Sequence, residues 1–191
     1  MEEAEPQKPN EKALRREAAE RRSTLRRVFW IVGIIALAAM LAGGGIFLNR
    51  RGTRNLPGHA VSDQGQEHVA PGHQFVYNSN PPTSGPHFAS PAEWGVYREE
   101  LPDQTFIHNL EHGGIWISYK PGVPDDVREK LEGFYQTWGR KIIVAPRAKN
   151  DSDVALAAWN HLDAFNLSEF SEERVERFIK AFRNRGPEFV P

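Results

Sequence analysis

The sequence predicts an α+β protein, in which one N-terminal transmembrane helix precedes a small extracytoplasmic domain with a mainly antiparallel sheet and two helices. Three observations lead to this fold class. Residues 28–48 form one uncharged apolar run, short β-branched and aromatic segments follow much later, and two further segments carry apolar residues at helical spacing. Strand and helix signals come in irregular order rather than as regular strand–helix repeats, which favours α+β over α/β.

The N-terminal quarter of the chain predicts a membrane anchor. Residues 1–27 are highly charged, and the run VFWIVGIIALAAMLAGGGIFL at residues 28–48 carries no charge. A helix needs about 20 apolar residues to cross a bilayer. A cleaved signal peptide is the alternative, because LAGGG places small residues near the end of the run. The length of the run and the 27 residues before it favour an uncleaved transmembrane helix.

Basic residues predict the orientation of this helix. Three arginines follow the run, at positions 50, 51 and 54, and six precede it: Arg15, Arg16, Arg21, Arg22, Arg26 and Arg27. An excess of Arg and Lys marks the cytoplasmic side. We therefore expect residues 1–27 in the cytoplasm, residues 49–66 as a linker, and residues 67–191 as an extracytoplasmic domain of a single-pass cell-membrane protein.

The elements of this domain follow from local patterns. Ile115–Tyr119 (IWISY) predicts a strand. Pro124 precedes a segment with helical apolar spacing, from Asp125 to Trp138. KIIVAPR predicts a short strand that Pro146 closes, and residues 154–165 favour strand over helix without excluding the helix. Ser171 is expected to open a last helix, which ends near Asn184.

Charge and cysteine content exclude several functions. From Asn55 onward there are 13 Lys and Arg against 19 Asp and Glu, a net charge of 13 − 19 = −6. An acidic domain lacks the basic footprint that nucleic-acid binding requires. The chain contains no cysteine, which excludes disulfides, thiolate nucleophiles and thiolate metal ligands.

The histidines point to a metal site. Six of the seven fall between His59 and His112, and HNLEH at residues 108–112 matches the H-x-x-E-H pattern of one class of zinc hydrolase. The rigid loop SNPPTSGPHF, residues 79–88, ends with His87 followed by Phe88, and its three prolines restrict the backbone. We predict a site formed by His87, His108 and His112, with Glu111 as ligand, general base or orienting carboxylate.

The local structure of HNLEH decides whether both of its histidines can bind one ion. On a helix, residues four apart lie about 6 Å apart along the axis and share a face. On a strand they are separated by about 13 Å, too far for one ion. Asp103 and the pair Gly113–Gly114 favour a short helix, whereas Thr105–Ile107 favours a strand. The sequence leaves both alternatives open.

The other histidines are expected to be structural or exposed. This applies to His59, His68 and His161, while His73 could return towards the same pocket. Tyr77 and Tyr97 flank the proline-rich loop, where we expect them to pack or to donate hydrogen bonds into the site.

Long motifs of the domain resemble those of a known family. YNSNPPTSGPHF (residues 77–88), PAEWGVY (91–97) and HNLEHGGIWISY (108–119) resemble the hallmark segments of the bacterial family called domain of unknown function 3105, as do VAPR (144–147) and ALAAW (155–159). The resemblance covers about residues 68–191. It implies that the proline-rich loop and HNLEHGG belong together and that a membrane anchor is common, and it implies no activity.

Three hypotheses for the function follow. In the first, the domain binds a transition-metal ion; imidazole ligands suit Zn, Cu(II), Ni or Fe(II). In the second, such an ion activates water in a hydrolase with Glu111 as base and a distant glutamate (Glu169, Glu172, Glu173 or Glu176) as third ligand. In the third, the domain binds no metal and is a structural or interaction module with a protein partner at the outer membrane face.

Overall fold

The computed structural model of the protein describes residues 30–41 and 56–190. Residues 30–41 are helical. Among the described residues no helix combines the length and the apolar character needed to cross a membrane, and the transmembrane part of the predicted fold is corrected accordingly. The predicted charged segment at residues 1–27 lies outside the described residues, as do residues 28–29 and 42–48 of the predicted transmembrane helix and residues 49–55 of the predicted linker.

Residues 56–190 belong to one compact unit built on a six-stranded sheet. The sheet order is β1–β6–β5–β3–β4–β2. The strands are β1 (His59–Ala60), β2 (Gly95–Val96), β3 (Ile115–Tyr119), β4 (Ile142–Pro146), β5 (Val154–Ala158) and β6 (His161–Phe165). The helices are α2 (Asp103–Glu111), α3 (Asp125–Trp138), the short 3₁₀ helix η1 (Leu167–Glu169) and α4 (Glu172–Phe182).

The sheet is mixed, which corrects the prediction of a mainly antiparallel sheet: two of its five strand pairs are parallel. Strand β4 pairs in parallel with both β3 and β2, whereas the β3–β5, β5–β6 and β1–β6 pairs are antiparallel. The reason lies in α3, which connects β3 to β4. A helical crossover returns the chain to the end where the first strand began, so the two strands run in the same direction.

This unit contains three α-helices within the described residues, one more than predicted. The additional helix is α2, where Thr105–Ile107 had favoured a strand. The other two begin where expected. Helix α3 follows Pro124, and the hydroxyl of Ser171 accepts a hydrogen bond from the Arg174 N–H at the start of α4. The segment 154–165, left open between strand and helix, is the β5–β6 hairpin.

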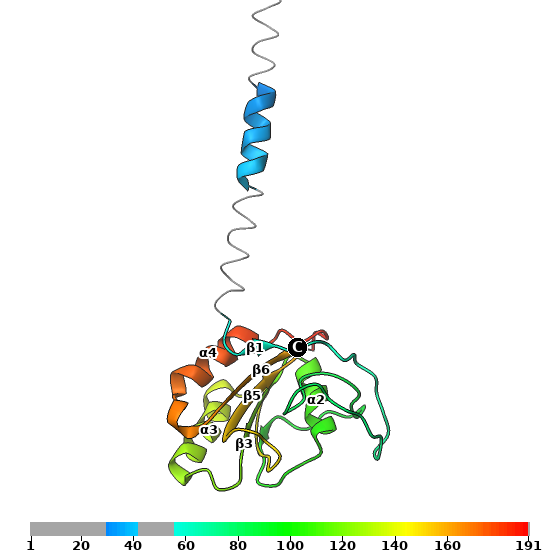
Figure 1. Ribbon diagram of the computed structural model, residues 1–191, viewed down its shortest axis with the longest axis vertical. Coiled ribbons are helices and arrows are strands. Elements are labelled where there is room, and N and C mark those ends of the chain that lie inside the picture. The colour runs from blue at the N-terminus through cyan, green and yellow to red at the C-terminus, as the bar shows by residue number, and fades with distance from the viewer. Residues whose placement is uncertain (1–29, 42–55, 191) are drawn as a thin grey trace, which may run out of the picture. The chain divides into compact units, whose positions relative to one another are not determined.

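The sheet has helices on both of its faces (Figure 1). Alternating side chains of its strands form two apolar cores. Helices α3 and α4 cover one face, where Ile117 and Leu156 meet Phe178. Helix α2 covers the opposite face, where Phe106 packs against Trp116 with ring centroids 4.9 Å apart. The period-two alternation of a strand assigns neighbouring residues of β3 to different cores. Because its apolar residues pack on the sheet, α2 is held in a fixed orientation.

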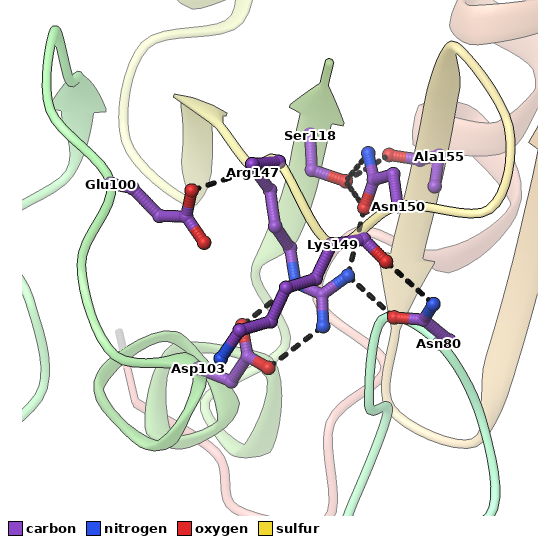
Figure 2. Close-up of polar contacts among 9 residues, drawn as sticks. Asn80, Glu100, Asp103, Ser118, Arg147, Lys149, Asn150 and Ala155 are labelled. Atoms are coloured by element: carbon purple, nitrogen blue, oxygen red, sulfur yellow. Dashed lines mark hydrogen bonds and ion pairs between the residues drawn. The ribbon is translucent and has the colours of Figure 1, made fainter. Parts of the chain in front are cut away.

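A buried arginine joins three segments on the α2 side of the sheet (Figure 2). The Arg147 guanidinium donates two hydrogen bonds of 2.8 Å to the Asp103 carboxylate, at the start of α2. It also donates to the side-chain oxygens of Asn80, in the proline-rich loop, and of Asn150. A bidentate arginine–carboxylate pair has a fixed geometry. The end of β4 thereby fixes both the start of α2 and the proline-rich loop.

Candidate metal centre

Helix α2 places the histidines of HNLEH on one side of a helical turn. The helix ends at Glu111, because Gly113 adopts φ 76°, which only glycine adopts readily. The His108 and His112 rings are 4.5 Å apart between centroids, and their Nε2 atoms are 3.1 Å apart. Of the two alternatives for HNLEH, the structure therefore shows the helix, and the two imidazole rings lie next to each other.

The proline-rich loop holds His87 in the interior, with no exposed surface. Two backbone hydrogen bonds fix it against the preceding segment: the His87 N–H donates to the Glu67 carbonyl at 2.9 Å, and the Val69 N–H donates to the His87 carbonyl at 2.8 Å. These bonds form a parallel bridge between His68 and His87. The two imidazole rings consequently lie 5.0 Å apart between centroids.

Tyr77 supports the same loop without itself belonging to the cluster of histidines and Glu111. Its hydroxyl donates a hydrogen bond of 2.5 Å to the carbonyl of Pro86, immediately before His87. Burial, followed by the negative charge of Asp103, raises the pKa of Tyr77 to about 12. The phenol therefore stays protonated and remains a donor. Tyr77 thus packs against the core, as one of the two expected roles requires, and its hydrogen bond goes to the loop backbone rather than into the site.

Four side chains form what we call the inner group: His68, His87, His108 and Glu111. One donor atom of each lies within 4.8 Å of the others, so these residues could hold a metal ion. The Glu111 Oε2 atom is 3.0 Å from His87 Nε2 and 3.8 Å from His68 Nε2. Tetrahedral ligands at zinc–nitrogen distances lie about 3.3 Å apart. Both measured separations are close to that value.

Hydrogen bonds set the tautomers of the two buried histidines. The His87 Nδ1 atom faces the Gly85 carbonyl at 2.8 Å, and the His108 Nδ1 atom faces the Phe88 carbonyl at 2.7 Å. A carbonyl can only accept, so each Nδ1 carries the proton of a neutral ring. Each Nε2 atom then carries the lone pair: that of His87 lies 3.0 Å from Glu111 Oε2, and that of His108 lies 3.1 Å from His112 Nε2. Metal-binding histidines are commonly oriented by such a bond at the other ring nitrogen.

The lone pair of His87 faces another acceptor. The His87 Nε2 atom points at the Glu111 carboxylate, which accepts but cannot donate when ionised. A second proton on His87 would resolve this contact, but burial lowers the pKa of His87 despite the opposing effects of Gly85 and Glu111. Both His87 and Glu111 are nearly inaccessible to water. A cation between these atoms satisfies both acceptors.

The sequence prediction missed His68, because nothing in its local pattern distinguishes it. Its ring stacks on the ring of His108, with centroids 5.0 Å apart and planes 9° apart. Its side chain is 48% exposed, in contrast to the buried remainder of the inner group. The bridge to His87 places it there, and such a bridge between two irregular segments has no sequence signal.

Four side chains form the outer group: His108, Glu111, His112 and Glu188, which again offer donor atoms within 4.8 Å of one another. The His112 Nε2 atom is 3.1 Å from the Glu188 Oε2 atom. Burial lowers the pKa of His112, and the neighbouring His108 lowers it further. Glu188 was not among the predicted residues.

The segment after α4 carries Glu188 to the end of α2. The Asn184 N–H donates to the Gly113 carbonyl at 2.8 Å, and the Glu188 N–H donates to the Glu111 carbonyl at 3.1 Å. Between these contacts, Gly186 packs directly on the backbone of Glu111 and Gly113, where a Cβ atom would overlap both. Two hydrogen bonds and a glycine contact thus fix this segment beside the donor atoms.

The predicted site residues are therefore divided between the two groups. His87, His108 and Glu111 lie together with His68, while His112 joins His108 and Glu111 in the outer group. Neither group contains the three remaining histidines of residues 56–190, which are His59, His73 and His161. Nor does either contain the distant glutamates considered as hydrolase ligands: Glu169, Glu172, Glu173 and Glu176.

Comparison with known proteins places the chain in a family. It belongs to the family described as "Protein of unknown function (DUF3105)", whose model matches residues 68–190. That match covers more than half of the chain and includes every residue of both groups. Searches of curated proteins and of solved structures gave no significant match.

Proposed function

We propose that this domain binds one divalent transition-metal ion through His68, His87, His108 and Glu111. The observation that supports the proposal is the convergence of two buried imidazole lone pairs and a carboxylate, with the opposite ring nitrogens engaged by carbonyl groups. Acceptors that face one another without a shared proton repel, and a bound cation reverses that repulsion.

The donor atoms restrict the identity of the ion. Three imidazole nitrogens and one carboxylate oxygen suit Zn, Cu(II), Ni or Fe(II). The chain contains no cysteine, and its two methionines, Met1 and Met40, precede this domain. Sulfur ligands for Cu(I) are thus lacking in residues 56–190.

Four protein ligands fill a tetrahedral shell, which is typical of sites that hold an ion rather than activate water. Glu111 supports this distinction. Its carboxylate is directed at His87 and is 5% exposed, so it is placed as a ligand rather than as a base facing a substrate. We therefore propose metal binding, rather than hydrolysis, as the function of the inner group.

The experiment compares metal retention by the full-length chain with that of two variants. The purified protein is stripped with a chelator, reloaded separately with Zn, Cu(II), Ni and Fe(II), dialysed and analysed by elemental mass spectrometry. We expect tight binding by the wild type and loss of the inner-group ion in His87→Ala. The control is His73→Ala, because His73 is exposed and belongs to neither group.

Two results would overturn the proposal. One is a wild-type protein that retains none of the four ions while circular dichroism shows an intact fold. The other is retention by His87→Ala equal to that of the wild type. In the first case the alternative, a structural module without metal, predicts a protonated His87 paired with Glu111, which nuclear magnetic resonance of the ring nitrogens would detect.

A further inference from the structure

The outer group differs from the inner group in how many ligands it can supply to an ion of its own. An imidazole Nε2 atom has one lone pair and binds one ion, whereas a carboxylate has two oxygens and can bind two. Of the two residues common to both groups, only Glu111 can therefore serve two ions at once. If His108 binds the inner ion, the outer group retains His112, Glu188 and one oxygen of Glu111.

These three ligands are already in place. The His112 Nε2 atom and the Glu188 Oε2 atom are 3.1 Å apart, close to the separation of about 3.3 Å expected for two ligands of one tetrahedral ion. The same His112 nitrogen is 3.1 Å from His108 Nε2, so the two groups adjoin.

The position of Glu188 is fixed by its backbone. The Glu188 N–H donates to the carbonyl of Glu111. The side chains of these same two residues would bind one ion together. Gly186 permits this approach, since any larger residue would overlap the end of α2. The carboxylate is 56% exposed, but its backbone is held at two points, at Asn184 and at Glu188 itself.

We propose that His112, Glu188 and a bridging Glu111 bind a second divalent transition-metal ion beside the first. This inference rests on the proposed function of the inner group. With three protein ligands, the outer ion has at least one position for water or for an oxygen ligand from solution, whereas the inner shell is filled. Two ions joined by a carboxylate lie about 3.5–4 Å apart in known two-metal sites.

The test is a Zn titration of the metal-free, full-length chain by isothermal calorimetry. We expect two equivalents for the wild type and for the His73→Ala control. The double variant His112→Ala/Glu188→Ala is expected to bind one equivalent, and that remaining equivalent also shows that its inner group is folded.

The outcomes separate this inference from the proposed function. One equivalent in the wild type, lost in His87→Ala, would retain the inner site and overturn the second ion. No equivalent in the wild type would overturn both. Two equivalents in the double variant would place the second ion elsewhere and also overturn the inference.

A second measurement tests the shared carboxylate. Two Cu(II) ions joined through Glu111 are magnetically coupled, so the electron paramagnetic resonance signal of the protein loaded with two equivalents should fall below twice that of the protein with one. Two independent signals would show that the ions are far apart and would overturn the bridging role of Glu111.

Discussion

Substitution of Arg147 tests whether the buried ion pair at the start of α2 stabilises the domain. The side chain is 4% exposed and donates two hydrogen bonds to Asp103, which is 18% exposed. Arg147→Ala removes the guanidinium and leaves the Asp103 carboxylate largely buried without its cation. Arginine Nη1 also bonds the side chains of Asn80 and Asn150, which would lose this donor.

The expected loss follows from the burial of both partners. Removal of one member of a buried pair costs about 3–5 kcal/mol, because the other charge remains uncompensated. Asp103 retains some contact with solvent, so we expect the lower end, about 3 kcal/mol. For a unit of 190 − 56 + 1 = 135 residues, about 4 °C per kcal/mol gives a fall in melting temperature of about 12 °C.

The assay is urea and thermal unfolding of metal-free, full-length protein, followed by circular dichroism. The chain offers a matched control, because Arg98 makes a similar bidentate contact with Glu132 but is 65% exposed. Arg98→Ala should cost about 0–1 kcal/mol, the range of surface ion pairs. A double variant, Arg147→Met/Asp103→Leu, should recover part of the loss, since no unpaired charge remains.

Equal effects in the two single variants would refute the reasoning, because burial would then make no difference to the free energy of unfolding. The same conclusion would follow if the double variant were less stable than Arg147→Ala. Either result would mean that an uncompensated buried charge is not the reason why Arg147→Ala destabilises the domain.

Three further changes test other parts of the structure. Gly186→Ala should lower the free energy of unfolding by about 1–3 kcal/mol through overpacking. The control is Gly133→Ala in α3, where a Cβ meets nothing within 4 Å and no such loss is expected. Equal melting temperatures of the two variants would contradict this reasoning. Because burial holds the pKa of His87 below its ordinary value of about 6.5, the unfolded chain binds more protons below that pH, and the metal-free protein should lose stability on acidification from about pH 7.5 to about pH 5.5. A urea midpoint that stays constant or rises would be contrary evidence. Ser171→Ala removes the cap of α4 and should cost about 1 kcal/mol in urea unfolding, and Ser168→Ala, at an exposed position, should change it by less than about 0.5 kcal/mol.

Local patterns in the sequence predicted most of the individual elements. The strand at Ile115–Tyr119, helix α3 after Pro124 and helix α4 after Ser171 are where their residues indicated. In each case the signal is short-range: β-branched residues, a proline before a helix, or a capping hydroxyl. Such signals do not state which strands pair, and the parallel pairs of β4 were missed.

Helix α2 illustrates a conflict that the sequence alone left unresolved. Thr105, Phe106 and Ile107 have strand propensity, yet the helix buries Phe106 and Ile107 completely against the sheet. Burial in a tertiary contact outweighs propensities of a few tenths of a kcal/mol per residue. The strand alternative could have been dismissed only with knowledge of the surface on which this segment packs.

Part of the candidate site could be read from the sequence because several residues of the inner and outer groups are close along the chain. His108, Glu111 and His112 share one motif, and the rigid loop identified His87. His68 joins them because its neighbours Glu67 and Val69 make backbone hydrogen bonds with His87, and Glu188 joins them through its own N–H, which donates to the Glu111 carbonyl. Backbone bonds of this kind leave no signal in the side-chain sequence. The location of the domain outside the cytoplasm and its protein partner stay predictions.

The inner group joins residues that are far apart in the sequence, and this has a consequence for the unfolded chain. An ion held by His68 and Glu111 would close a loop of 111 − 68 = 43 residues, in a protein that has no cysteine with which to form a disulfide. In the chain-entropy model of crosslinks, closing a loop of about 15 to 100 residues lowers the entropy of the unfolded chain. This stabilises the folded state by about 3–4.7 kcal/mol. Such a metal crosslink would form without the oxidation of thiols, so the supply of the ion would govern how strongly the domain resists unfolding.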